Sequence, residues 1–227
     1  MFVEMSVQWL FNVDLSLDLV SLVMGCMVFR RSWPFAYKCL FFWNVLRVLV
    51  SAFVYLWQYY THTSNHWITN LFSPLLCLGS LLVFYGASID PRVRRGNKWL
   101  LIAFPLLTAV SWLRGAPTDM INTVALVCFD FLVLLSVCLA FVDLLVRTDS
   151  FHFIRQPMFW LASGLFFYSV ETIVGYAYWE YSKKMLLFGL YMFIFFSADY
   201  LQDAGVIGCF ICIYLERYAK KPGTEPL

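Results

Sequence analysis

Charged residues are scarce in this 227-residue chain, making up 13% of it, about half the share that is usual in a soluble globular domain. Hydrophobic residues account for 62% and aromatic residues for 20%, and the mean hydropathy is +0.74. The loops between the apolar stretches are too short to hold a soluble catalytic or DNA-binding domain. We therefore expect a membrane protein with no nucleic-acid partner.

Residues suited to metal or redox chemistry are also few. His62 and His66 form an HxxxH pair in one loop, and His152 lies in a loop predicted on the other side of the membrane, so the three cannot share a metal ion. Cys209 and Cys212 form a CxxC pair inside an apolar run, where thiols pack as small hydrophobic groups. We expect neither a metal ion nor another cofactor.

Catalytic and targeting motifs are missing as well. The chain has no GxSxG, HExxH or glycine-rich phosphate loop, so no pattern names a reaction and an enzyme is the least favoured class. The last apolar stretch contains no lysine, which argues against a retinal protein. The beginning of the chain, MFVEMSVQW, lacks the basic region of a signal peptide.

Long apolar stretches are what the sequence has in abundance. A helix rises about 1.5 Å per residue, so roughly 20 apolar residues cross a hydrocarbon layer of about 30 Å. The predicted transmembrane helices are Leu10–Phe29, Cys39–Gln58, Ile68–Ile89, Trp99–Leu113, Met120–Val146, Pro157–Trp179 and Met185–Leu215. We predict an all-α fold in which residues 1–218 form a single seven-helix transmembrane domain and residues 219–227 form a short tail. The stretch 185–215 is long enough that it could be one helix or two, and the charge pattern favours one.

The orientation follows from the distribution of lysine and arginine. Twelve of the sixteen basic residues fall in the first, third and fifth loops and the tail, and three fall in the other loops. The sixteenth, Arg47, lies within a segment. Cytoplasmic loops of membrane proteins are enriched in Lys and Arg. This asymmetry predicts that the N-terminus is outside and that the C-terminus is cytoplasmic.

The segment Pro157–Trp179 contains a single ionisable side chain, Glu171. An acid facing lipid is costly, so the face that it shares with Tyr168 and Tyr178 should point into the bundle. Asp14 and Asp18 lie one turn apart in the outer half of the first segment. We expect a ligand-binding cavity between the first, sixth and seventh segments, touched by these three acids and two tyrosines and holding water, a cation or protons. In the alternative, the aspartates reach the aqueous edge and Glu171 bonds a tyrosine.

Arg47 lies well inside the second segment, where a lone charge is expensive. Counting residues from the segment ends places Asp130 and Asp199 near its depth. We therefore predict a buried ion pair between Arg47 and one of these two aspartates.

Small residues form a further pattern in the last segment. Gly205, Gly208, Cys209 and Cys212 share one face of the predicted helix. Small faces allow helices to approach closely, so this face predicts either packing within the chain or a homodimer contact.

Two stretches resemble a group of multi-pass membrane proteins of Bacteroidota that are about as long as this chain. They are Asn70–Tyr85 (NLFSPLLCLGSLLVFY) and Arg155–Gly175 (RQPMFWLASGLFFYSVETIVG). The residues that match the group's pattern are Asn70, Pro74, Pro157, Phe159, Trp160, Gly164 and Tyr168. The acid usual after the third-segment proline is absent, since Leu75 and Leu76 follow Pro74. The group is largely uncharacterised, and some members stand beside sensor kinases, so the resemblance implies a location in the bacterial inner membrane.

Three functions fit these observations. The first is a receptor-like or sensory module that signals to a separate partner, such as a kinase, because the chain has no soluble output domain of its own. The second is a small transporter or channel that uses the carboxylates as a proton or cation path. The third is an intramembrane enzyme acting on lipid. A cavity confined to the outer half favours the receptor, whereas an acid-lined passage to both sides favours the transporter.

Overall fold

The computed structural model describes the backbone of residues 2–61, 66–113, 122–147, 153–182 and 188–219. It describes side chains over residues 13–61, 66–110, 122–146, 153–177 and 194–217. Within these residues the chain forms seven α-helices and one short 3₁₀ helix, so the predicted all-α fold is confirmed. The helices are α1 (Phe2–Val28), α2 (Phe35–Thr61), α3 (His66–Ala87), α4 (Pro91–Leu113), α5 (Thr123–Arg147), η1 (Phe153–Arg155), α6 (Pro157–Ser182) and α7 (Phe188–Ala219).

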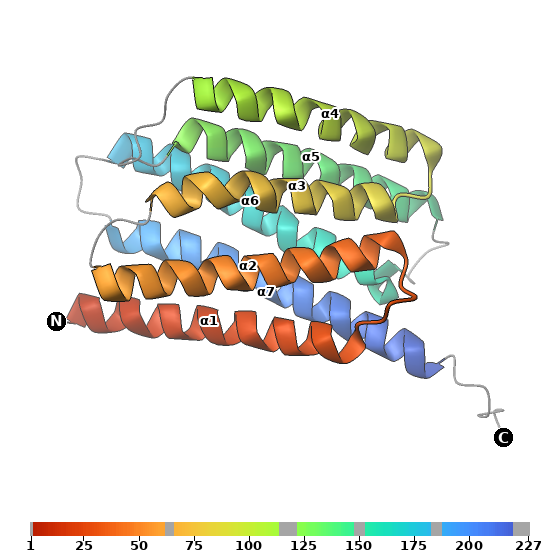
Figure 1. Cartoon of the computed structure of the whole chain (residues 1–227), viewed down its shortest axis with the longest axis horizontal. Coiled ribbons are helices and arrows are strands. Elements are labelled where there is room, and N and C mark those ends of the chain that lie inside the picture. Colours follow the sequence, from red (N-terminus) through yellow and green to blue (C-terminus); the bar gives the residue numbers. More distant parts are fainter. Residues whose placement is uncertain (1, 62–65, 114–121, 148–152, 183–187, 220–227) are drawn as a thin grey trace.

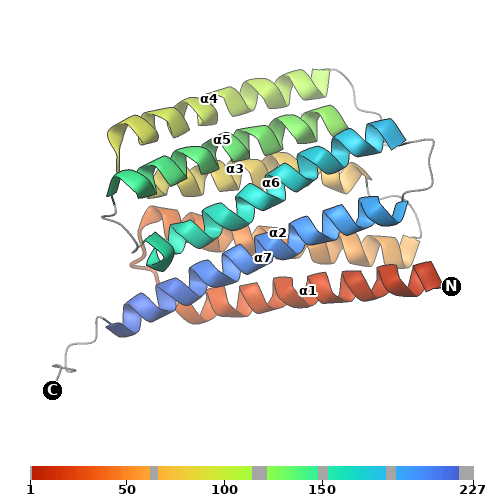
Figure 2. The same ribbon diagram turned by 180° about the vertical axis from the view of Figure 1, so that it is seen from behind.

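Successive helices run in opposite directions, so α1 begins at one end of the bundle and α7 ends at the other (Figure 1). Seen from behind, α5, α6 and α7 lie over α2 and α3 (Figure 2). Each helix packs on the next, α1 also packs on α7, and α3 also packs on α5. Six helices therefore form a closed ring, and α4 lies outside it against α3 and α5.

Five of the helices are long and apolar enough to cross a membrane. They are α2, α3, Thr123–Val146 of α5, Pro157–Ala177 of α6 and Ile194–Arg217 of α7. Large apolar side chains such as Phe42, Leu106 and Leu145 are exposed on the outside of the bundle. A soluble protein rarely exposes so much apolar surface in continuous patches, whereas a lipid-facing surface requires it. These features indicate a membrane protein.

Helix α4 begins earlier than its apolar pattern suggested. The stretch DPRVRRGNK was predicted as a loop, but its residues from Pro91 on form the first turns of α4. Asp90 caps this helix, because its Oδ1 accepts hydrogen bonds from the backbone N–H groups of Arg92 (2.7 Å) and Val93 (3.4 Å). Proline is well suited to the first helical position. The basic residues of this stretch therefore lie on a helix rather than on a loop.

Helix α7 is continuous from Phe188 to Ala219, which answers whether the last apolar stretch is one helix or two. At about 1.5 Å per residue it is roughly 48 Å long, more than a hydrocarbon layer requires. Its candidate membrane span is the part from Ile194 to Arg217.

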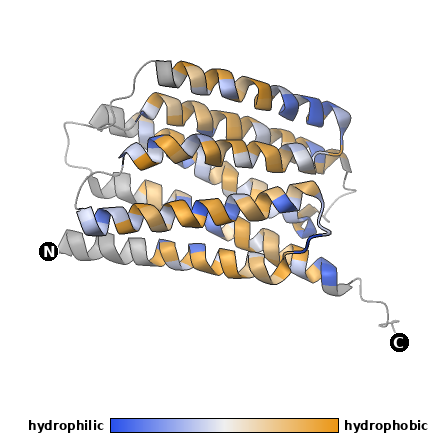
Figure 3. Cartoon of the chain, in the orientation of Figure 1, coloured by the Kyte–Doolittle hydropathy of each residue, from blue (hydrophilic) through white to orange (hydrophobic). Residues whose placement is uncertain are grey.

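Hydrophilic residues gather at the end of the bundle where α1 ends, α4 begins and α7 ends (Figure 3). The antiparallel order brings the basic residues of separate segments together there. They include Arg30, Arg31, Arg92, Arg94, Arg95, Arg155 and Arg217. Inside the ring, apolar side chains fill the half next to this basic end, whereas buried polar residues gather where α4 packs on α3 and α5: Ser88, Asn97, Ser136 and Asp143.

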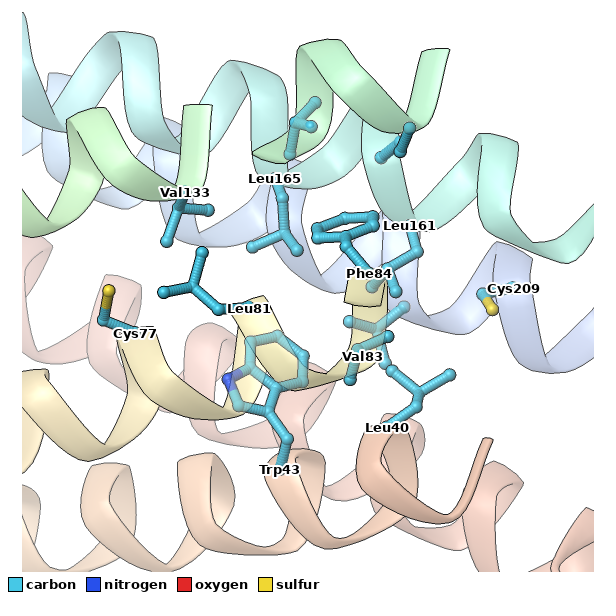
Figure 4. Close-up of a cluster of buried hydrophobic side chains, with 14 of the residues drawn as sticks. Leu40, Trp43, Cys77, Leu81, Val83, Phe84, Val133, Leu161, Leu165 and Cys209 are labelled. Carbon is cyan, nitrogen blue, oxygen red and sulfur yellow. The ribbon is translucent and has the colours of Figure 1, made fainter. Parts of the chain in front are cut away.

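That apolar half contains several of the most buried residues of the protein. Leu40, Phe84, Leu161 and Phe210 are each at most 1% exposed. They come from α2, α3, α6 and α7, and Figure 4 shows the first three converging with Val83. The polar cavity inside the ring lies on the other side of this apolar layer.

Candidate functional site

A cavity of about 150 Å³ lies inside the ring, lined by residues of α1, α2, α3, α5, α6 and α7. Its charged lining residues are Asp14, Asp18, Arg47, Asp130 and Asp199. At roughly 30 Å³ per water molecule, it has room for about five waters. Ligand pockets for drug-sized molecules are larger, about 300–1,000 Å³, so this cavity suits protons, water or a small ion.

Arg47 is the basic residue of this cavity, and it joins three helices. Its Nη2 lies 2.7 Å from Asp18 Oδ1 on α1 and bonds Asp203 Oδ1 on α7. The same nitrogen lies 3.4 Å from both Ser21 Oγ and Asn44 Oδ1. The buried ion pair was therefore predicted for the right arginine, but its partners are Asp18 and Asp203 rather than Asp130 or Asp199.

The register of the helices explains this outcome. Asp14 and Asp18 lie one turn apart on α1, and Asp199 and Asp203 lie one turn apart on α7, so each pair shares a face. Counting from the segment ends placed Asp130 and Asp199 near the depth of Arg47, but in the bundle it is Asp203, one turn beyond Asp199 on α7, that reaches the guanidinium. The spacing of the two α7 aspartates was the signal that could have identified Asp203 as a candidate.

Negative charge exceeds positive charge in this cluster. Asp14 and Asp199 are within electrostatic range of Asp18, Asp203 and Arg47, so four carboxylates surround one guanidinium. Asp18 and Asp203 are almost fully buried, and the Oδ2 atom of each has no hydrogen-bond partner within the described part of the chain. Buried carboxylates cannot all remain charged without compensation, so water, a cation or protons must complete the cluster.

Asp130 of α5 forms a second acidic point in the cavity. It lies beside Thr172 of α6, and Tyr168 is within electrostatic range of both Asp130 and Asp199. Tyr168 is therefore close both to the aspartate of α5 and to the cluster around Arg47. Asp130 was predicted as an ion-pair partner of Arg47, and the structure places it in the cavity lining instead.

The structure separates Glu171 from the residues predicted to surround it. Asp14, Asp18 and Tyr168 line the cavity, but Glu171 lies outside its described lining. Its Oε2 instead accepts a hydrogen bond of 2.8 Å from Ser197 Oγ on α7. The alternative prediction, in which Glu171 bonds a tyrosine, is therefore also wrong about the partner, which is a serine. Tyr178, the fifth predicted site residue, lies outside the residues whose side chains are described.

The small residues of α7 are used for packing within the chain. A Cβ added to Gly205 would lie 2.7 Å from Gly164 Cα and 2.7 Å from the Trp160 carbonyl oxygen, so α6 and α7 cross with their backbones in contact. Gly208 faces the Trp160 indole, and Cys209 is fully buried. The intramolecular alternative therefore accounts for three of the four residues, and Cys212 is partly exposed at the edge of an outer groove.

These features define a helical membrane protein with a small acid-rich cavity inside a ring of six helices. Comparison with protein-family models, curated proteins and solved structures finds no match to this chain. The resemblance to membrane proteins of Bacteroidota therefore rests on the sequence patterns of the third and sixth segments alone.

Proposed function

We propose that the protein is a seven-pass sensory module of the bacterial inner membrane, with the N-terminus outside and the C-terminus in the cytoplasm. It binds a small cation or protons in the cavity and passes a conformational signal to a separate partner, such as a kinase. One observation carries this proposal: the acidic cavity occupies one half of the space inside the ring, and apolar side chains fill the half of that space next to the basic end. A site confined to one side suits a receptor better than a passage.

The ligand class follows from size and charge. A cavity of about 150 Å³ is too small for most organic ligands, and the four carboxylates grouped around Arg47, three of which line the cavity, attract cations rather than anions. Intramembrane ionisable residues are generally functional. The four acids lie on α1 and α7, so a ligand bound among them acts on the contact between these two helices.

A transporter or channel is the second candidate, and the same excess of carboxylates favours it. Its path would have to open through the apolar layer around Leu40, Phe84, Leu161 and Phe210. Purified protein in proteoliposomes separates the two candidates. Cation or proton flux through the protein would support the transporter, whereas ligand-dependent stabilisation without flux would support the sensor.

Asp199→Asn tests the cavity without removing an ion-pair partner of Arg47. We expect sodium or pH to shift the melting temperature of the wild-type protein in nanodiscs, with choline as the control cation. A ligand at 100 times its Kd stabilises a protein by about 2.7 kcal/mol. Asp199→Asn should lose most of this shift, because Asp199 lines the cavity.

Glu171→Gln is the matched control, since Glu171 is an intramembrane acid outside the described cavity lining. It should keep the sodium or pH response of the wild-type protein. Equal losses in the two variants, or no response in the wild-type protein, would contradict the proposed site.

The proposed orientation is tested by labelling single introduced cysteines in intact cells with a membrane-impermeant maleimide. Thr61 and Arg92 are exposed at opposite ends of the bundle. Thr61→Cys should be labelled from outside and Arg92→Cys only after the cells are permeabilised, with the wild-type protein giving the background of its native cysteines. Labelling of Arg92→Cys in intact cells would reverse the orientation.

A further inference from the structure

A groove of about 860 Å³ follows the outer surface of α7, between α1 and α6 and away from the acidic cavity. Its floor and walls are apolar, and include Leu17, Ala204, Ile207 and Ile211. Charged residues line it only at one end, where Arg155 and Glu216 are found among the described lining residues. The groove thus combines an apolar channel with a charged end.

The charged end lies where a membrane surface would be. Glu216 is next to the last residue of the candidate span of α7, and Arg155 lies just before the candidate span of α6. From Tyr200 to Glu216 the groove follows α7 for about 24 Å at 1.5 Å per residue. That length is close to the thickness of one leaflet with its headgroups, roughly 20–22 Å.

We propose that this groove binds one zwitterionic phospholipid. The phosphate lies against the Arg155 guanidinium, the headgroup ammonium lies toward Glu216, and an acyl chain follows Ala204, Ile207 and Ile211. Guanidinium and phosphate groups make strong charge-assisted hydrogen bonds, and basic pockets between helices bind lipid headgroups. The carboxylate of Glu216 in the same groove favours a headgroup that carries both charges over one that is purely anionic.

A second transmembrane helix fits the groove less well. Helices approach closely over glycine, but the space over Gly208 is taken by the Trp160 indole, which would lie 3.0 Å from an added Cβ. The indole is held in place by a 2.8 Å hydrogen bond from its N–H to the Ile154 carbonyl oxygen. An acyl chain can bend around this indole, whereas a rigid helix cannot.

The experiment uses the full-length protein in mild detergent after removal of lipid. Binding of phosphatidylethanolamine, phosphatidylglycerol and a diacylglycerol with the same chains is measured by native mass spectrometry. We expect one phosphatidylethanolamine per chain, and weaker binding of the other two lipids. Arg155→Gln should weaken phosphatidylethanolamine binding about fivefold, since a basic residue near the membrane surface contributes about 1 kcal/mol.

Ala204→Phe, which fills the groove, should reduce occupancy without removing a charge, and Arg217→Gln is the control because Arg217 lies at the same end outside the described lining. Wild-type affinity in both Arg155→Gln and Ala204→Phe, or equal binding of diacylglycerol, would overturn the proposal. Tighter binding of phosphatidylglycerol would overturn the zwitterionic headgroup. A wild-type dimer that Ala204→Phe dissociates would assign the groove to a second copy of the chain instead.

Discussion

Arg47→Met should lower the free energy of unfolding by about 3–5 kcal/mol, the usual cost of removing one partner from a buried ion pair. The substitution leaves Asp18 and Asp203, which are at most 1% exposed, without the guanidinium that they share. Methionine fills a similar volume, so the loss reports charge rather than a cavity. Unfolding in mixed detergent, followed by circular dichroism, measures it.

The triple variant Arg47→Met, Asp18→Asn, Asp203→Asn provides the control. Buried ion pairs can be replaced by neutral groups at little cost, so the triple variant should recover most of the stability lost in the single one. If the single and triple variants are equally unstable, the contribution of Arg47 lies in packing rather than in charge. If Arg47→Met unfolds like the wild-type protein, the ion pairs do not stabilise the bundle.

Gly205→Ala should lower the free energy of unfolding by up to about 2 kcal/mol, the upper overpacking cost less about 1 kcal/mol that alanine contributes as the better helix former. The new methyl group would lie 2.7 Å from backbone atoms of α6 at Gly164 and Trp160. Backbone atoms cannot rotate away, so α6 and α7 would have to move apart along their extensive contact. Overpacking of this kind typically costs 1–3 kcal/mol before any gain in helix propensity, and occasionally more.

Gly208→Ala is the matched control, one turn further along α7. Its added methyl group would meet the Trp160 indole at 3.0 Å, a side chain that can shift slightly. It should therefore change stability by less than Gly205→Ala in the same unfolding measurement. A larger effect at Gly208 than at Gly205 would contradict the backbone contact between α6 and α7.

The fold could be predicted from the sequence to the level of helix number and class. The long apolar stretches predict the helices, because a chain segment in lipid must hydrogen-bond its backbone N–H and C=O groups within itself, as a helix does. The start of α4 was missed because a basic stretch resembles a loop when only hydropathy is considered. The cap at Asp90 followed by Pro91 was the local signal for a helix start.

The site could be predicted only in part. Residue type and helical spacing predicted two features correctly. Arg47 is buried, and one cavity is lined by Asp14, Asp18 and Tyr168. The partners of Arg47 depend on how α1, α2 and α7 pack together, which is a tertiary property that spacing within one helix does not contain. Glu171 was predicted to line the cavity because it shares a helix face with Tyr168. In the structure it accepts a hydrogen bond from Ser197 on α7 and lies outside the described lining.

The ring of helices closes between α1 and α7, the first and last helices of the chain, and this has a consequence for biogenesis. Chains are synthesised and inserted from the N-terminus, so α1 and α2 enter the membrane long before α7. The Asp18–Arg47 pair lies within this first hairpin, and it lets two costly charges enter the bilayer as a neutral unit. Asp203 arrives with the final helix and adds a second acid to the same arginine. Helix α7 thus completes the acidic cluster, and a chain cut before α7 would keep the Asp18–Arg47 pair with Asp14 as its one excess acid in the cavity.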